Sequence, residues 1–455
     1  MSRTPRRSAL WFCLLFVLAA VRPAAAAPEA LEDSTFAERW TLPNGLEVVT
    51  RDVPGASAVS VVWGYHTGLD DDPAGEPGLA SLMAEVHFTA AAGDVPARTR
   101  EEMESLRPQG WSLRVNRRQT LFAETATPAQ LAGVLRQVAV RMRGVRVDDA
   151  LLRGARASVR RLLGARYFGG PDAILQSQPR EFARGLDKAG IVALAAAKGL
   201  DRETPKRVSQ AIARAYVPAN GVLVLAGDLG GLNLHAILAR EFGDLPAGTR
   251  APDPPPGRLD SVSVVMERSD VRAPAAALGL LAPALADTLH PSFYMAMLLV
   301  GMQAKQVWDP AGAPGGSRFQ YAMLDDPGFV RLYPPVPGRG PVGPPQVSGA
   351  FDDLTDGLFD TMILQDDYEN LRASVLWLLG GPMVDAVLDR VRQDPAALNV
   401  LATATASRAL WGSDAFWAEY RARLEPGRLP DASMWLPWLR DPVHRAVLLL
   451  RPAAR

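Results

Sequence analysis

The sequence predicts an α+β fold in two related parts, each built from a β-sheet flanked by helices. Short runs of β-branched and aromatic residues are mixed with helical stretches, without strict strand–helix–strand alternation. A Pro- and Gly-rich stretch without apolar periodicity, 246–258, divides the chain. Both parts open with a strand and end near an apolar strand after helices, which indicates a weak internal duplication.

The N-terminus has the layout of a secretory signal peptide. Arg3, Arg6 and Arg7 form a basic start, an apolar run follows over 8–21, and 24–27 offers small residues for cleavage. This run is shorter than the roughly 20 residues that span a membrane, although an uncleaved anchor is the alternative. We therefore expect export to the periplasm, or secretion, with no stable membrane anchor after cleavage.

Composition excludes some classes of protein and function. The only cysteine, Cys13, lies in the signal run, so the mature chain has no disulfide and no thiolate metal ligand. The whole chain has 49 basic and 49 acidic residues. Removing residues 1–27 removes four arginines and no acid, which leaves 45 basic residues against 49 acidic ones. A nucleic-acid binder would be strongly basic, so we expect no nucleic acid as partner.

The first part is predicted to contain a strand pair, two further strands and several helices. An Asn-Gly turn signal lies between short apolar runs in the first strand region. Thr-Pro pairs at 127–128 and 204–205 are typical helix starts. The predicted strands lie at 40–49 (a strand pair), 58–65 and 222–226, and the predicted helices at 79–88, 125–143, 148–165, 204–215 and 234–242.

The second part is predicted to open with a strand over 261–267. A helix follows over 292–302, and the Pro/Gly-rich stretch 334–345 is interpreted as a long surface loop. More helices follow before a final strand over 446–450.

Four segments, in this order, resemble the insulinase and mitochondrial-processing-peptidase zinc proteases. They are the opening strand 42–49 (LPNGLEVV), the helix 78–88 (GLASLMAEVHF), the segment 216–228 and the domain end 242–246 (FGDLP). The resemblance covers most of 38–335 and, more loosely, the C-terminus. It implies two insulinase-type domains that form one half-shell, and two half-shells that close around a peptide.

The resemblance also implies the domain organisation. We expect a signal peptide over 1–27, an N-terminal peptidase-like domain over 28–245, a Pro-rich linker over 246–258 and a C-terminal peptidase-like domain over 259–455.

The zinc site of that family has no complete counterpart here. It needs two histidines at i and i+4 on one helix, a glutamate base beside them and a distant glutamate as third ligand. Ser81 and Glu85 stand at the two histidine positions, and Ala84 stands at the position of the base. The third ligand is expected within 150–165, which contains no acidic residue. We therefore predict no zinc, no other cofactor and no catalytic residue.

A second family motif, an Arg and a Tyr that grip the substrate, is also altered. The 317–319 segment and Gly328 fit its frame, which places Leu324 and Arg331 at the two grip positions. Tyr333 lies two residues further along and is a doubtful substitute.

Other candidate sites have plainer interpretations. The five histidines are well separated in the sequence, so each is interpreted as structural or as a surface residue. The acidic run 70–72 lacks a calcium-binding pattern and is interpreted as a solvated turn. The 312–316 stretch (GAPGG) is interpreted as a plain turn, and 435–438 (WLPW) as either an interface patch or core.

The leading functional hypothesis is a non-catalytic subunit that pairs with an active insulinase-type homologue as a heterodimer, with a peptide as its possible ligand. A stand-alone periplasmic peptide-binding or scaffold protein is the alternative. An active metallopeptidase with a rearranged site is a third hypothesis.

Overall fold

The computed structural model describes the chain from 37 to 453 with short gaps. The described ranges are 37–73, 76–99, 101–102, 111–250, 259–308, 313–337, 342–360, 365–379, 385–424 and 432–453. The predicted signal peptide and most of the predicted linker lie outside these ranges. None of the described helices is long and apolar enough to cross a membrane.

The first sheet has six strands, in the order β1-β2-β6-β3-β5-β4. β2 and β6 run parallel, and every other neighbouring pair is antiparallel. The bounds are β1 Ala37–Thr41, β2 Glu47–Asp52, β3 Val59–Tyr65, β4 Trp111–Val115, β5 Thr120–Ala126 and β6 Gly221–Gly227. The predicted Asn-Gly turn joins β1 to β2, where Gly45 has a φ of 85°. The Asn44 side chain donates a hydrogen bond of 2.7 Å to the Phe242 carbonyl, which anchors the turn.

The second sheet repeats this topology. Its order is β7-β11-β8-β10-β9, and its parallel pair, β7 and β11, corresponds to the parallel pair β2 and β6 of the first sheet. The bounds are β7 Val262–Arg268, β8 Ala275–Leu281, β9 Phe319–Gln320, β10 Phe329–Leu332 and β11 Arg445–Pro452. Strands β7 to β11 therefore correspond one by one to β2 to β6, so the duplication predicted from the sequence is confirmed. β1 has no counterpart among the described strands of the second sheet.

Helices cover both sheets. Those of the first part are α2 Leu79–Thr89, α4 Leu131–Arg143, α5 Asp149–Phe168, α6 Pro171–Ala183, α7 Lys188–Ala195, α8 Pro205–Ala215 and α9 Leu234–Phe242. Those of the second part are α10 His290–Val307, α11 Pro344–Asp360, α12 Gln365–Leu378, α13 Asp385–Gln393, α14 Pro395–Trp411, α15 Asp414–Ala422 and α17 Leu436–Arg440. Side-chain caps stabilise the N-termini of several helices. At α5 the Asp148 side chain accepts a hydrogen bond from Leu151 N, and at α8 the Thr204 side chain accepts one from Arg207 N.

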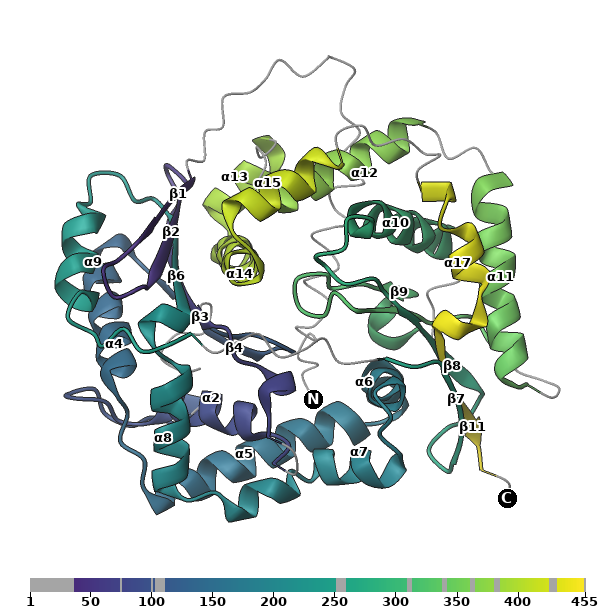
Figure 1. Cartoon of the computed structure of the whole chain (residues 1–455), viewed down its shortest axis with the longest axis horizontal. Helices are drawn as coiled ribbons and strands as arrows, with labels where there is room; N and C mark the ends of the chain where they lie inside the picture. Colours follow the sequence, from purple (N-terminus) through teal and green to yellow (C-terminus); the bar gives the residue numbers. More distant parts are fainter. Residues whose placement is uncertain are drawn as a thin grey trace, which may run out of the picture.

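The two parts exchange one helix each. α14, from the second part, packs on β3, β5 and β6 of the first sheet, and α6, from the first part, packs on β8 and β11 of the second (Figure 1). Leu398 and Ala402 of α14 share a core cluster with Val62 and Val224 of the first sheet. Each part therefore completes the hydrophobic core of the other, although all strands of the first sheet precede 246 and all strands of the second follow 258.

Two sequence predictions are wrong in their bounds. The helix predicted over 125–143 begins at Leu131, because β5 continues to Ala126 and a 3-10 turn over Pro128–Gln130 follows it. The loop predicted over 334–345 ends early, because α11 starts at Pro344, where a proline is tolerated in a first turn. The sequence analysis also missed β4, β8, β9, β10, α6 and α7.

Candidate functional site

α2 and α5 lie against each other below the first sheet, and this contact defines the candidate site. Every residue of α2 is buried, because the helix lies between the sheet and α5. Ser81 and Glu85 are only 5% and 6% exposed, and Ala84 is fully buried. The helix with the predicted motif positions Ser81, Ala84 and Glu85 thus faces the helix on which the third ligand was expected.

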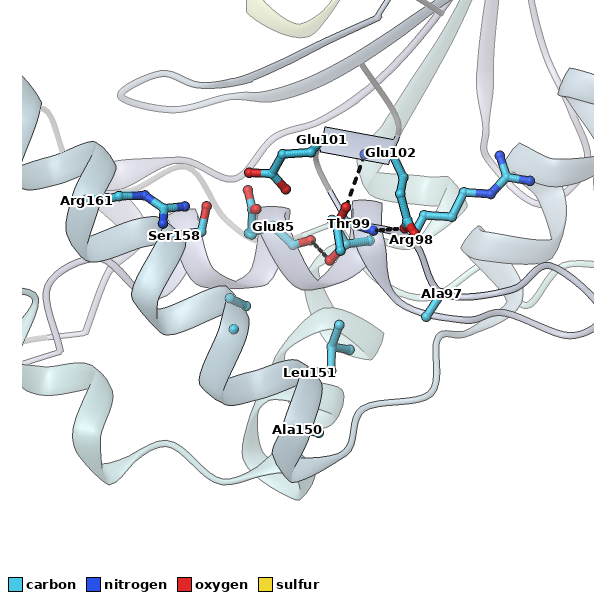
Figure 2. Close-up of a pocket in the computed structure, with 13 residues that line it drawn as sticks. Glu85, Ala97, Arg98, Thr99, Glu101, Glu102, Ala150, Leu151, Ser158 and Arg161 are labelled. Atoms are coloured by element: carbon cyan, nitrogen blue, oxygen red, sulfur yellow. Dashed lines mark hydrogen bonds between the residues drawn. The ribbon is translucent and has the colours of Figure 1, made fainter. Parts of the chain in front are cut away.

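A cavity of about 350 Å³ opens between α2, α5 and the segment that follows residue 96 (Figure 2). Glu85 and Thr89 from α2 line its buried side, and the carboxylates of Glu85 and Glu101 point into the same space. The remaining lining residues are Ala97, Arg98, Thr99, Glu102, Ala150, Leu151, Gly154, Ala155, Ser158 and Arg161. Residues with small side chains on α5 leave the room that the cavity occupies.

The described residues that line this cavity include carboxylates, hydroxyls and guanidinium groups but no histidine. Of the three altered motif positions, only Glu85 lines the cavity and offers an oxygen ligand. α5 contributes apolar residues, the Ser158 hydroxyl and the Arg161 guanidinium, and a fixed cation opposes a divalent ion. Within the described ranges, no group of three or more His, Cys, Asp or Glu side chains is placed to hold a metal ion. We therefore assign no metal chemistry to these residues.

His87 lies on α2 but belongs to the core rather than to the cavity. Its ring is fully buried and packs on Phe122 and Tyr216, with centroid distances of 5.1 Å and 5.0 Å. Burial, together with the nearby Arg141 guanidinium, lowers the pKa of His87 to about 3. Arg141 also donates to the His87 and Ala90 carbonyls at 3.1 Å and 2.7 Å, which satisfies the C-terminal end of α2. The structural interpretation of His87 is confirmed.

The two predicted grip positions lie elsewhere. Leu324 is buried, and its carbonyl accepts a hydrogen bond of 2.5 Å from Trp411 Nε1. Arg331 lies in β10 and forms an ion pair of 3.5 Å with Asp326. Tyr333 is fully buried and donates its hydroxyl proton to Gln320 at 2.9 Å. All three side chains thus serve internal packing or pairing.

The acidic run 70–72 is not the solvated turn that the sequence suggested. Asp72 accepts hydrogen bonds from Gly78 N and Ala80 N at 2.6 Å and 2.7 Å, at the start of α2. Asp70 forms an ion pair of 3.4 Å with Arg184. These carboxylates hold the N-terminus of α2 and connect it to α6, a role that depends on tertiary contacts.

The tryptophans of 435–438 pack inward. Trp435 is buried, lies 5.1 Å from the Phe293 ring and donates to the Ser292 hydroxyl at 3.0 Å. Of the two interpretations left open by the sequence, core packing is the one that holds for Trp435.

Comparison with known proteins identifies the fold but not a sequence family. No family model matches the chain, and no curated protein matches it either. Solved structures do match. A protease from Helicobacter pylori matches with a TM-score of 0.64 and 13% identity, over 92% of this chain and 100% of that one.

Two further structures match. A peptidase M16 inactive domain from Pseudomonas fluorescens matches with a TM-score of 0.62 and 12% identity, over 92% and 98% of the two chains. The periplasmic protease PqqL from Escherichia coli matches with a TM-score of 0.65 and 15% identity, over 94% of this chain but 48% of PqqL. The chain therefore has the fold of one M16, or insulinase-type, half-shell, and it spans about half the length of PqqL.

Proposed function

We propose that the protein is a non-catalytic subunit of an exported insulinase-type zinc protease, and that it supplies half of the substrate chamber to an active homologue. The observation that carries this proposal is the donor set between α2 and α5. Those helices meet as a metal-binding pair would, yet they offer one carboxylate, Glu85, opposite a guanidinium, Arg161. The scaffold of the site is kept while its chemistry is replaced.

The match to one half of PqqL supports pairing with a second half-shell. PqqL, described as a periplasmic protease, is about twice as long as the region that this chain matches. A half-shell of the same fold has been described as an inactive M16 domain in Pseudomonas fluorescens. The region that this chain matches is one half of PqqL, so in this proposal a second half-shell completes the chamber. A signal-like N-terminus and the periplasmic location of PqqL both favour export.

An edge strand that packs on α2 supports a role in holding peptide. β4 pairs with β5, and no strand within the described ranges pairs with its other edge. β4 also packs on α2, with the Trp111 and Phe88 rings 5.1 Å apart. Because an extended peptide can add to the edge strand of a sheet through main-chain hydrogen bonds, a peptide on β4 would lie beside α2. The subunit would then contribute binding surface without a catalytic group.

Co-expression with the nearest homologue from the same genome that has an intact H-x-x-E-H motif tests the proposal. We expect the two chains to elute as one complex with a buried interface well above about 1,000 Å². We also expect peptide cleavage by the homologue to rise when this chain is present. If the chains elute separately and the homologue cleaves equally well alone, the protein is a stand-alone binding or scaffold protein.

A matched control locates the chemistry within the complex. Replacing the catalytic glutamate of the homologue by glutamine should abolish cleavage while the complex still forms. Cleavage that persists in this complex, and that a chelator stops, would assign a working metal site to the present chain and overturn the proposal.

A further inference from the structure

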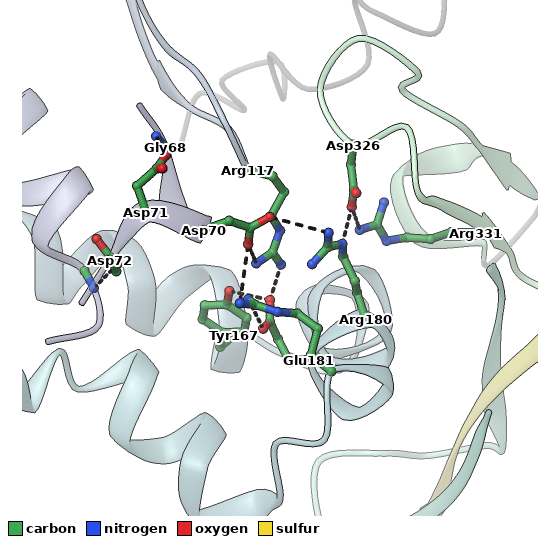
Figure 3. Close-up of polar contacts among 12 residues, drawn as sticks. Gly68, Asp70, Asp71, Asp72, Arg117, Tyr167, Arg180, Glu181, Asp326 and Arg331 are labelled. Atoms are coloured by element: carbon green, nitrogen blue, oxygen red, sulfur yellow. Dashed lines mark hydrogen bonds and ion pairs between the residues drawn. The ribbon is translucent and has the colours of Figure 1, made fainter. Parts of the chain in front are cut away.

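A largely buried group of charged residues joins the two sheets, and we call it the inter-sheet cluster (Figure 3). One member comes from the turn before α2 and one from the β4–β5 turn. Two come from α6 and one from the residue directly after it, and the last two come from the β9–β10 connection and from β10. Its members are Asp70, Arg117, Arg180, Glu181, Arg184, Asp326 and Arg331. The sequence analysis singled out only Arg331 and the acidic run containing Asp70.

On the side of the first sheet, the cluster holds α6 through Glu181. The Glu181 side chain is fully buried and forms an ion pair with Arg117, whose side chain is 7% exposed. Arg184 donates to Glu181 at 3.2 Å and also pairs with Asp70 at 3.4 Å. Arg117 lies 3.5 Å from the same Asp70 carboxylate, which closes a ring of four groups.

On the side of the second sheet, the cluster holds the β9–β10 connection through Asp326. The Asp326 carboxylate lies 2.6 Å from Arg180 Nε and 3.5 Å from Arg331 Nη2. The neighbouring Asp325 accepts a hydrogen bond of 2.7 Å from the Asn116 side chain of the β4–β5 turn. The second sheet is thus tied to both α6 and the rim of the first sheet.

Burial decides how strongly these contacts act. An exposed ion pair contributes little, because water screens it and competes for both partners. Removing one partner of a buried pair leaves a desolvated charge without compensation, which is strongly unfavourable. The Arg180 and Asp326 side chains are only 8% and 11% exposed. A rotation of the second sheet away from α6 would expose or separate these charges, and the free-energy cost of doing so opposes the motion.

We propose that the inter-sheet cluster is a clasp that fixes the second sheet against the first, so that the chain moves as one rigid half-shell. The exchange of α6 and α14 between the sheets also restrains motion of one sheet relative to the other. This inference does not depend on the proposed function.

Pulsed electron–electron spin measurements can test the clasp. Cys13 is the only cysteine, so Cys13→Ser leaves a background in which Leu162→Cys and Met434→Cys carry two spin labels. These positions are 53% and 52% exposed and lie in the first and second parts. We expect one narrow distance distribution for the labelled chain. A broad or two-peaked distribution would by itself overturn the clasp.

A matched pair of variants then assigns the rigidity to the cluster. Asp326→Asn removes the counter-ion of Arg180 and should broaden the distribution. Asp94→Asn removes the exposed partner of Arg136 and should leave the distance distribution unchanged. If Asp326→Asn does not fold, Arg331→Gln removes the second cation beside Asp326 and serves in its place. A distribution as narrow as that of the parent in the folded variant would show that the cluster is not a clasp.

Discussion

Replacing Glu181 by glutamine should destabilise the protein through the inter-sheet cluster. The Glu181 side chain is fully buried, and it accepts from Arg184 at 3.2 Å and from the Tyr167 hydroxyl at 3.2 Å besides its ion pair with Arg117. Glutamine keeps the shape of the side chain but carries no charge. Arg117 and Arg184 would then share only Asp70 as a counter-ion.

The size of the effect follows from the pKa of Glu181. Burial alone would raise this pKa, but Arg117, Arg184 and Arg180 more than offset burial and lower it to about 2. A depressed carboxyl pKa adds stability above the pKa of the unfolded chain, about 4.5, and this stability is lost as the pH falls towards 2. The shift corresponds to about 3 kcal/mol. Together with the arginines left uncompensated, Glu181→Gln should cost about 3–5 kcal/mol at pH 7.

Urea unfolding followed by tryptophan fluorescence measures this cost. The difference between the parent and Glu181→Gln should stay constant from pH 8 to pH 5 and shrink at lower pH. Glu419→Gln, which removes the exposed partner of Arg423, should lie within about 1 kcal/mol of the parent. A Glu181→Gln effect below about 1 kcal/mol at pH 7, or one that does not shrink in acid, would refute the reasoning.

Three further predictions concern the candidate site. Purified protein should hold far less than one zinc per chain, because Glu85 is the only strong donor that the motif positions offer to the cavity. Elemental analysis that finds one tightly bound zinc per chain after treatment with a mild chelator would contradict this prediction. The variant Ser81→His, Ala84→Glu, Glu85→His restores two ligands and the base but no third ligand on α5, so we expect it to stay inactive; chelator-sensitive peptide cleavage would show an unidentified acid. Burial raises the pKa of Asp72 to about 7, and hydrogen bonds from backbone N–H groups offset burial only in part. A raised carboxyl pKa stabilises the fold below about pH 4, and up to about 4 kcal/mol of this stability should be lost as the pH rises to 7. Asp72→Asn should flatten this part of the pH profile of unfolding, and an unchanged slope would disprove the assignment.

Local signals in the sequence predicted many of the elements. The Asn-Gly turn at Gly45 and the cap at Thr204 marked true element ends, because turns and caps depend on neighbouring residues. A local cap signal also misplaced the predicted start of α4. Thr127 carries a cap signal, but it caps a short 3-10 turn that precedes the helix. The short strands β9 and β10 left no clear pattern, because strand pairing stabilises them rather than their own composition: β10 pairs with β8, and β9 pairs with β10.

At the candidate site, too, the sequence determines some features and tertiary packing decides others. The identities of Ser81, Ala84 and Glu85 are properties of the sequence alone, and they decide which ligands the helix can offer. The cavity beside Glu85 and the inward packing of His87 could not be deduced, because they depend on how α2 lies between the sheet and α5.

The sequence by itself determined the repeated strand pattern and the chemical groups available at the altered motif. Tertiary structure decided that α6 and α14 exchange sheets and that Arg180 meets Asp326 across the two parts. Strand and helix signals arise from periodicity within a few residues, so one sequence displays them. Contacts between distant segments arise from the burial of whole faces and the pairing of desolvated charges, and these depend on the free energy of the complete packed chain.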